Sequence, residues 1–206
     1  MSAADFQAIA RDALEIWARS RDELCELDGA IGDGDLGITI SSGALAVIAA
    51  WDAEADRMTP STMFRVASKA FAAANPSTMA ALLSGAALGA ARAVEGVDAP
   101  TRENWTAALQ SAIAVIERRG GAARGDKTIL DAMWPALESI SDQTLEDGEV
   151  LHVMIAAAAD GVTATQGLQS VRGRAAWVGD RSIGQPDPGA TAFLRLLQAL
   201  EQASRI

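Results

Sequence analysis

The chain has 206 residues, of which 50% are hydrophobic and 21% are charged, an ordinary globular balance. Its formal net charge of -10 argues against a nucleic-acid surface, although a bound cation can still bring a nucleotide to an acidic protein. The single cysteine excludes an intrachain disulfide and fits a reducing cytoplasm, and no signal peptide or membrane span is expected.

The spacing of apolar residues predicts helices along the whole chain. The first is expected from a cap at Ser2 to about Leu27, where a run of glycines ends it. The others are expected over 40–51, from Thr59-Pro60, over 77–95, from Pro100-Thr101 to Gly120-Gly121, over 127–140 with a kink at Pro135, over 145–169 and over 191–204.

Residues 173–189 are expected to form a loop, because glycine and proline are frequent there. Abundant alanine and the absence of tyrosine indicate closely packed helices rather than a sheet. No alternating strand pattern, repeat or linker is visible. The sequence therefore predicts one all-α domain over residues 1–206, a barrel or bundle of about eight antiparallel helices.

The first glycine-rich segment, LDGAIGDGDLGITI from Leu27 to Ile40, contains a literal match to the dinucleotide pattern G-x-G-x-x-G. A true dinucleotide loop follows a strand and opens a helix within a βαβ unit. Here the preceding residues are charged and have a helical pattern, and no βαβ unit surrounds them. The match therefore does not predict a Rossmann site.

The same segment carries three aspartates, Asp28, Asp33 and Asp35. Carboxylates are hard oxygen ligands, and the neighbouring glycines let the backbone fold tightly around an ion. Completed by phosphate oxygens, this set would suit Mg2+. A surface turn rich in Asp and Gly explains the same residues without a metal. The loop alone does not decide between the two.

A second segment, GGAARGDKT, comes close to the phosphate-binding pattern G-x-x-x-x-G-K-[ST]. Asp126 is inserted before the lysine, so Lys127 and Thr128 fall out of register with the loop amides that would hold a phosphate. A Walker A loop is therefore not expected. A helix that ends at Gly120-Gly121 and a new helix N-terminus explain the pattern, and a helix N-terminus can itself bind an anion.

The third segment, RGRAAWVGDRSIGQPDPGATAF, is long, irregular and rich in Gly, Pro, Arg and Asp. Long irregular stretches inside compact domains are often functional. Arg174 and Arg181 are candidate phosphate partners, because the guanidinium matches phosphate geometry. Surface salt bridges are the commoner role of an arginine.

Three motifs taken in chain order, LDGAIGDGDLG, GDKTILDAMWPAL and GRAAWVGDRSIGQPDPGA, resemble the L subunit of dihydroxyacetone kinases. They span residues 27–190. The resemblance implies an eight-helix barrel that holds ADP or ATP at one end through Mg2+. It also implies specific roles for residues at matching positions. These are Asp28, Asp33 and Asp35 as metal ligands, Leu36, Gly37, Ile38, Thr39, Ser77 and Thr78 at the phosphates, Gly120, Ile129 and Arg174 at the nucleoside, and Asp187, Pro188 and Gly189 closing the site.

The sequence departs from the family pattern at two places. Leu36 stands where the family commonly has histidine, and AANPSTMAA replaces a loop rich in glycine and serine. These departures favour a divergent member that acts on a related ketose.

The resemblance implies a cytoplasmic kinase subunit that works only with a K-type subunit, which holds the sugar through its own histidine. The chain's single histidine, His152, is expected to be structural, because no motif surrounds it. Freely exchanging ATP, or a phosphotransferase-system protein that rephosphorylates bound ADP, would be the donor. A homodimer is left open. The alternative is a non-catalytic nucleotide-sensing module that regulates a partner protein.

Overall fold

A computed structural model of the chain describes residues 3–54, 58–141 and 145–205. The expected helix cap at Ser2 lies outside these residues. Within them the protein is all-α, as predicted, and no strand occurs. The helices are α1 (Ala3–Ala18), α2 (Arg21–Ile31), α3 (Leu36–Asp52), α4 (Pro60–Ala74), α5 (Thr78–Ala93), α6 (Arg102–Gly120), α7 (Leu130–Ser139), α8 (Val150–Thr165) and α9 (Pro188–Ala203), with short 3-10 helices η1 (Asp147–Glu149) and η2 (Arg174–Ser182).

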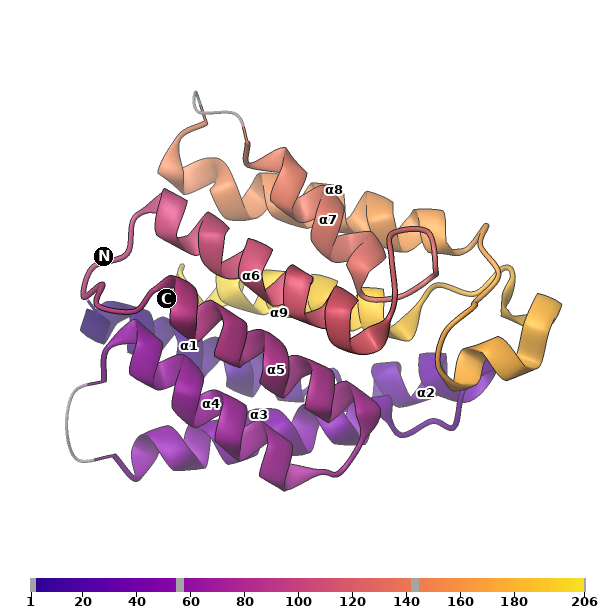
Figure 1. Ribbon diagram of the computed structural model, residues 1–206, viewed down its shortest axis with the longest axis horizontal. Helices are drawn as coiled ribbons and strands as arrows, with labels where there is room; N and C mark the ends of the chain where they lie inside the picture. The colour runs from indigo at the N-terminus through magenta and orange to yellow at the C-terminus, as the bar shows by residue number, and fades with distance from the viewer. Residues whose placement is uncertain (1–2, 55–57, 142–144, 206) are drawn as a thin grey trace.

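Eight of these helices form a closed antiparallel ring. Going round the ring, α1 packs against α3, and each of the helices from α3 to α9 packs against the next, until α9 returns to α1. Neighbours alternate in direction (Figure 1). The remaining helix, α2, lies outside the ring and contacts α3, α9 and η2. The predicted barrel of about eight helices is therefore confirmed, with α2 as an addition.

Most helix starts follow directly from capping residues in the sequence. The side chains of Thr59, Ser77 and Asp187 accept hydrogen bonds from the amides of Thr62 (3.2 Å), Ala80 (3.0 Å) and Ala190 (2.7 Å). Such caps satisfy amides that have no partner inside the helix. Proline follows Thr59 and Asp187 at the first helical position, where its missing N–H costs nothing. Gly121 ends α6 in the left-handed region, at φ 59°.

The expected single helix up to Leu27 is wrong. The chain breaks between α1 and α2, where the amides of Arg19 and Ser20 bond three residues back to Ile16 and Trp17, tightening the last turn of α1. The glycine run was expected to end helical structure after Leu27, but α2 continues through Gly29 as far as Ile31.

Other expected boundaries also differ. Helix α3 begins at Leu36 rather than at residue 40, and α8 spans Val150–Thr165 rather than 145–169. Helix α7 begins at Leu130 rather than at 127, because Lys127 has a left-handed backbone with φ 60°. The expected loop over 173–189 contains η2 and the first residues of α9.

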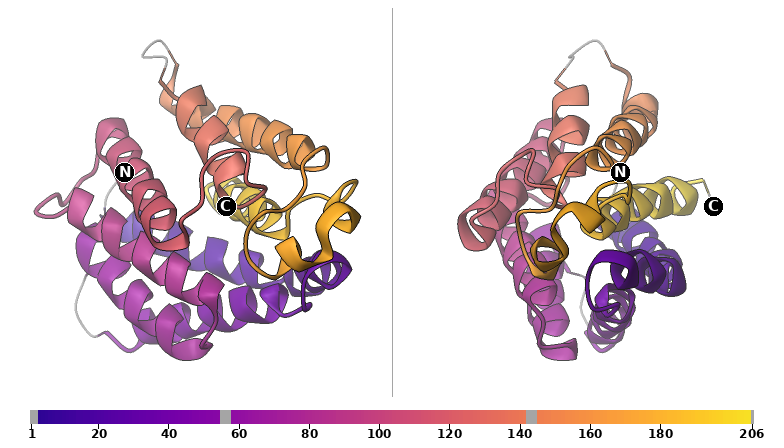
Figure 2. Two further views of the ribbon diagram at one scale, coloured as in Figure 1. Left: turned by 45° about the vertical axis from the view of Figure 1, so that its right-hand side comes forward. Right: turned by 90° about the vertical axis from the view of Figure 1, so that its right-hand side faces the viewer.

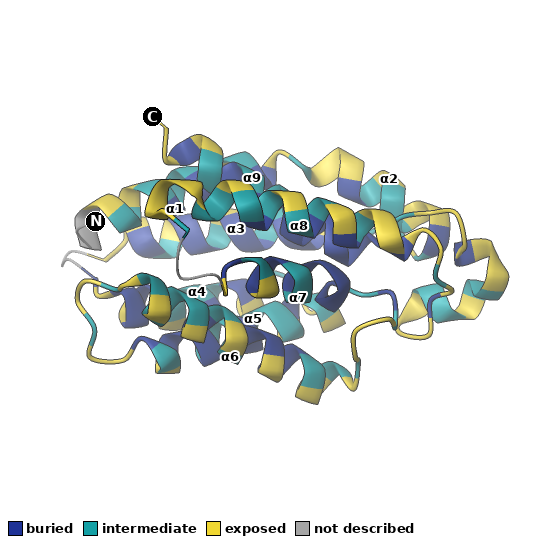
Figure 3. Ribbon diagram, turned by 90° about the horizontal axis from the view of Figure 1, so that it is seen from above, coloured by how far each residue is buried: buried dark blue, intermediate teal, exposed yellow. Residues whose placement is uncertain are grey.

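The helix α9 joins the two halves of the hydrophobic core. One cluster lies among α1, α3, α4 and α9, and the other among α5 to α9. Buried Trp17 ties α1 to α9 by donating its indole N–H to the carbonyl of Ala192 at 2.8 Å. Buried residues lie where the helices face one another, and exposed residues lie on the outer faces and around η2 (Figure 3).

Gly161 on α8 permits the close approach of α7. A Cβ at this position would collide with the backbone carbonyl oxygen of Asp131, which no side-chain rotation can move away. Gly161→Ala is therefore expected to lower the free energy of unfolding by about 1–3 kcal/mol through overpacking. Denaturant titration tests this, with Gly148→Ala as the control, because a Cβ there would meet nothing within 4 Å. Equal stability of the two variants would contradict the packing argument.

Candidate functional site

Four helices, α3, α5, α7 and α9, begin at the same end of the barrel (Figure 1). We call this the loop end. It consists of residues 32–35, 75–77, 121–129 and 166–187. The right-hand view of Figure 2 faces it and shows the segment around η2 beside α2. Helix N-termini carry partial positive charge and free amides, so their convergence favours bound anions.

The three predicted metal ligands come together at the loop end. Oxygens of Asp28, Asp33 and Asp35 all lie within 4.8 Å of one another. Asp28 belongs to the last turn of α2, and the other two belong to the turn before α3, where Gly34 takes φ 77°. An oxygen of Asp28 also accepts the amide of Leu36 at 3.2 Å, which fixes the cluster to the start of α3.

Arg174 of η2 supplies the positive charge at this cluster. Its guanidinium forms an ion pair with Asp33 and lies 4.0 Å from an oxygen of Asp35. Three carboxylates this close repel one another, so a cation among them is strongly favoured. The structure thus brings Arg174 to the predicted metal ligands, and its expected contact with a nucleoside stays a prediction.

The first turns of α3 and α5 are joined by polar side chains. The hydroxyl of buried Thr39 donates a hydrogen bond to the hydroxyl of Ser77 at 3.3 Å and accepts one from the side-chain nitrogen Nδ2 of Asn75 at 3.0 Å. Thr78 is exposed, and Ile38 is 41% exposed. Leu36 and Gly37 are buried. A Cβ on Gly37 would collide with the carbonyl of Arg21, so this glycine serves close packing of α3 on α2.

Of the residues predicted to contact the nucleoside or close the site, Ile129, Asp187, Pro188 and Gly189 lie where α7 and α9 begin. A Cβ on Gly189 would stand 3.1 Å from a carboxylate oxygen of Asp187, 3.3 Å from Met79 and 3.4 Å from Ile129. Asp187, Gly189 and Ile129 are therefore brought together, with Pro188 between the first two. Gly120 is placed separately, beside Leu82 of α5, and Leu82 packs in the same core cluster as Ile129.

Burial makes the carboxyl group of Asp187 an unusually weak acid. Its pKa is raised to about 7, chiefly by burial and further by the charge of Asp131, while the amides of Ala190 and Gly189 and the charge of Lys127 act in the opposite direction. The pKa of Lys127 is lowered by its own burial, an effect that Asp187 partly opposes. The protonation state of Asp187, at the start of α9, can therefore change near neutral pH.

The contacts of three further residues were not predicted from the sequence. Asp131 accepts the amides of Gly125 at 2.6 Å and Thr128 at 2.8 Å, and the Thr-x-x-Asp spacing could have indicated this cap. Asn75 joins Thr39, although the sequence showed it only as a departure from the family loop. Lys127 is fully buried and bonds three backbone carbonyls, which no local pattern foretells.

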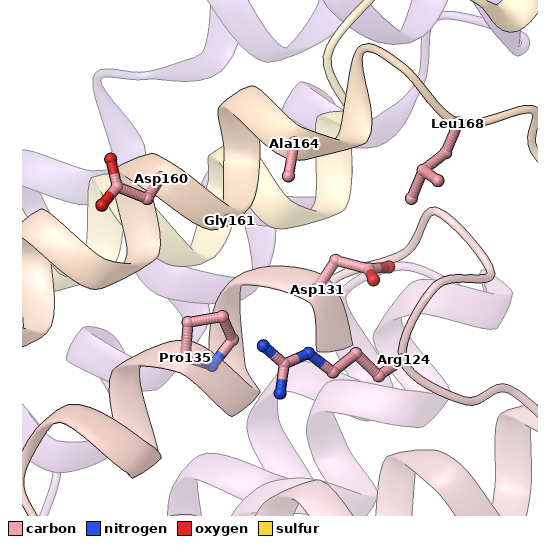
Figure 4. Close-up of a pocket in the computed structure, with 7 residues that line it drawn as sticks. All are labelled: Arg124, Asp131, Pro135, Asp160, Gly161, Ala164 and Leu168. Atoms are coloured by element: carbon pink, nitrogen blue, oxygen red, sulfur yellow. The ribbon is translucent and has the colours of Figure 1, made fainter.

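A pocket of about 270 Å³ lies between α7 and α8 (Figure 4). Its lining includes Arg124, Asp131, Asp160 and Gly161. Arg124 is ion-paired with Glu138 at 2.9 Å, and the carboxylate of Asp131 is occupied by the two backbone amides named above. None of the residues predicted for the metal or the nucleotide lines this pocket. Among the described helices, none is long and apolar enough to cross a membrane.

The fold and the loop end define an all-α barrel whose helix N-termini and clustered carboxylates suit a phosphate ligand carried by a cation. Residues 30–202 match the DAK2 domain family, and the chain belongs to this family. Asp33 and Asp35 lie inside the matched range, and Asp28 lies two residues before it.

The relatives confirm the resemblance to the L subunit. The chain is 31% identical to the ADP-binding subunit DhaL of PEP-dependent dihydroxyacetone kinase 1 from Listeria innocua, over 87% of this chain and 85% of that one. It is 29% identical to the corresponding DhaL subunit from Escherichia coli, over 93% and 92%. It is 32% identical to an L-erythrulose 1-kinase from Mycolicibacterium smegmatis over 90% of this chain, but spans only 33% of that enzyme. The chain is therefore a divergent L-type member of a kinase family.

The fold is also that of a solved kinase structure. The dihydroxyacetone kinase from C. freundii, in complex with AMP-PNP and Mg2+, matches with a TM-score of 0.76 at 24% identity. The match covers 94% of this chain and 33% of that one. This likeness confirms the helical barrel.

The raised pKa of Asp187 predicts a specific pH dependence of stability. Its folded value of about 7 lies above the ordinary 3.8, so the folded state keeps the proton between these values. The stabilisation by this proton is complete below about pH 4 and is lost as pH rises towards 7.

Asp187→Asn should remove this dependence while keeping a side-chain oxygen that can cap α9. The free energy of unfolding of the wild type, measured relative to the variant by urea titration, should fall by roughly 2–3 kcal/mol between pH 5 and 8. A difference that does not change with pH would contradict the assignment.

Proposed function

We propose that this chain is the Mg-nucleotide-binding, phosphoryl-transferring subunit of a cytoplasmic dihydroxyacetone-type ketose kinase. The observation that carries the proposal is the cluster of Asp28, Asp33 and Asp35 at the N-terminus of α3. The ADP-binding subunits among its relatives support the ligand, and the kinases support the reaction.

The donor set of the cluster fits magnesium. Three carboxylate oxygens within 4.8 Å can share one small hard cation, and the ion pair of Arg174 with Asp33 supports a positive charge at this place. Asp28, Asp33 and Asp35 would hold the ion, which supplies charge neutralisation to the phosphates when bound. An acidic loop can therefore serve a phosphate ligand through the ion.

The chain's own residues would bind and orient the nucleotide. Leu36, Gly37, Ile38 and Thr39 would present the start of α3 to the phosphates, with Ser77 and Thr78 at the start of α5. Gly120, Ile129 and Arg174 would contact the nucleoside, and Asp187, Pro188 and Gly189 would close the site. In phosphoryl transfer, such alignment contributes more than covalent chemistry does.

The acceptor sugar is proposed to reach the site on a separate K-type subunit. His152, the chain's single histidine, lies in the first turn of α8, which begins at the end of the barrel opposite the loop end. Its side chain is 79% exposed, with Nδ1 3.9 Å from Glu201, so it is a surface residue that cannot hold a sugar at the aspartate cluster. This supports the proposal that a partner brings the sugar to the loop end.

An exposed tryptophan at the loop end supports this docking. Trp177 of η2 is 83% exposed, and Ile183 nearby in sequence is 49% exposed. Tryptophan is enriched among residues that dominate binding energy at protein interfaces. On the same segment, Arg174 reaches the aspartate cluster. A K-type partner that contacts Trp177 would therefore lie beside the metal site.

Two phosphoryl donors are compatible with this arrangement. ATP could exchange freely, or ADP could stay bound and be rephosphorylated by a phosphotransferase-system protein. The PEP-dependent kinases among the relatives favour the second donor. Stoichiometric ADP that survives extensive dialysis of the purified protein would identify the second route, and rapid loss of nucleotide would identify the first.

A non-catalytic nucleotide sensor is the alternative. Leu36 is buried and apolar where the family commonly has histidine, so it offers no polar contact to a phosphate. Phosphate transfer from this chain to a ketose on a K-type subunit would exclude the sensor. Nucleotide binding without transfer would favour it.

Loss of one carboxylate should weaken metal binding. Asp33→Asn in the presence of ADP is expected to weaken Mn2+ binding at least tenfold, because a neutral amide replaces a charged ligand. Loss of the free Mn2+ paramagnetic resonance signal during titration measures this affinity. Asp22→Asn is the matched control, since Asp22 is an exposed acid on the same helix as Asp28. Equal Mn2+ affinity in both variants would remove Asp33 from the site.

Phosphorylation of dihydroxyacetone should require a K-type subunit, and Trp177→Ala should raise the concentration of that subunit needed for half-maximal rate by roughly tenfold or more. Leu45→Ala is the control, because Leu45 is 52% exposed on α3 but lies more than two turns beyond the loop end. Activity of this chain alone would overturn the two-subunit proposal, and equal effects of the two variants would remove Trp177 from the interface.

A further inference from the structure

Lys127 is held in a cage of backbone carbonyls. Its side chain is 1% exposed, and its ammonium donates to the carbonyls of Leu168 (3.0 Å), Ser182 (2.5 Å) and Gln185 (2.7 Å). An ammonium has three donors, so all of them are used. The residue that resembled a phosphate-binding lysine in the sequence therefore faces the protein's own backbone.

The three carbonyls belong to both ends of one segment. We call residues 166–187, between α8 and α9, the strap. Its two ends are also joined directly, by the amide of Gly184 to the carbonyl of Gln166 at 2.8 Å and by the amide of Ser170 to the hydroxyl of Ser182 at 2.9 Å. Lys127 comes from outside the strap and bonds both ends, so it acts as a cross-link at the base of a loop.

The backbone around Lys127 is arranged to aim this side chain. Lys127 is the one non-glycine residue in the described part of the chain with positive φ, at 60°. Such a conformation is disfavoured for a residue with a Cβ and persists only where its surroundings enforce it. Asp131 provides that enforcement by accepting the amides of Gly125 and Thr128 on either side.

A neighbouring residue holds the strap at a second point. The carboxylate of Asp126 accepts a hydrogen bond from Nε of Arg172 at 2.8 Å. The backbone carbonyl of Asp126 accepts a second one from the amide of Val171 at 3.4 Å. The strap in turn carries Arg174, whose guanidinium is paired with Asp33 of the aspartate cluster. A continuous set of contacts therefore runs from Lys127 through the strap to the metal ligands.

We propose that Lys127 is a positioning residue for the nucleotide site, because it cross-links the two ends of the strap and so holds Arg174 over the aspartate cluster. This inference rests on the proposed function. Lys127 does not touch the ligand, and its effect is transmitted through the strap. Methionine matches the length of lysine but cannot donate, so Lys127→Met would leave three carbonyls without their donors.

Lys127→Met is therefore expected to open the strap and weaken binding of ADP with Mg2+ by about tenfold to a hundredfold, the usual effect of removing a residue that orients ligands. The control is Lys69→Met, which changes the chain's one other lysine, an exposed residue of α4. Hydrogen exchange should show faster exchange at Ser170 and Gly184 in Lys127→Met, with α1 and α3 unchanged. Calorimetry well below the melting temperature separates positioning from stability, since a fully folded variant that is merely less stable binds as the wild type does.

The inference would be overturned if, in Lys127→Met, the amides of the strap still exchanged slowly and ADP still bound with wild-type affinity. Loss of protection in every helix would also overturn it, because Lys127 would then support the whole fold. If the wild type itself binds no nucleotide, the proposed function fails, and so does the positioning role that rests on it.

A measurement on the wild type keeps the inference falsifiable if the variant does not fold. Acetylation of the native protein by an amine-reactive ester, followed by peptide mass spectrometry, should modify Lys69 at least a hundredfold faster than Lys127. Denaturation should bring both lysines to the same rate. Equal rates in the native protein would show that the cage is open and would contradict the proposal.

Discussion

Eight helices that alternate in direction around a closed ring place four helix N-termini at the same end, and the chemistry of this protein depends on that constraint. Each of these N-termini presents amides that have no partner inside the helix. Side chains accept hydrogen bonds from some of these amides. The acceptors are Asp28 at α3, Ser77 at α5, Asp131 just before α7 and Asp187 at α9. The four helices still present the positive ends of their dipoles at the same end of the barrel, which favours an anion there although the net charge of the chain is -10.

In the proposed function, a cation would reconcile the acidity of the first glycine loop with a phosphate ligand. Without one, three carboxylates within 4.8 Å would repel both one another and a phosphate. In this structure Arg174 provides the compensating charge, and it does so from the strap rather than from the loop itself. The metal-ligand cluster and the strap are therefore coupled electrostatically. The strap also presents Trp177 to solvent, so the contacts that orient the proposed metal site and the proposed partner surface share one segment.

Signals confined to a few neighbouring residues were readable from the sequence. Thr59-Pro60 and Ser77 each combine a side-chain acceptor with the start of an apolar helical pattern, and each begins a helix as predicted. Asp187-Pro188 has the same combination, but the helix was expected only from residue 191, whereas α9 begins at Pro188. The carboxylates of Asp28, Asp33 and Asp35 were close in sequence and could be grouped before their positions were known. Lys127 could not be understood in this way, since its partners lie 41 to 58 residues away and are backbone carbonyls that carry no sequence signature. The break at Ser20 was missed for another reason, because it arises from two short-range backbone bonds within an otherwise regular helical pattern.

The central claim is that this end of the barrel binds a nucleotide through a metal held by the three aspartates. Calorimetric titration of the stripped protein with ADP, first in Mg2+ and then in EDTA, tests it most directly. The account predicts tight binding with a stoichiometry of one in Mg2+ and loss of most of that affinity in EDTA, because the phosphates would then face uncompensated carboxylates. Absence of binding in both conditions, or equal affinity in both, would contradict it.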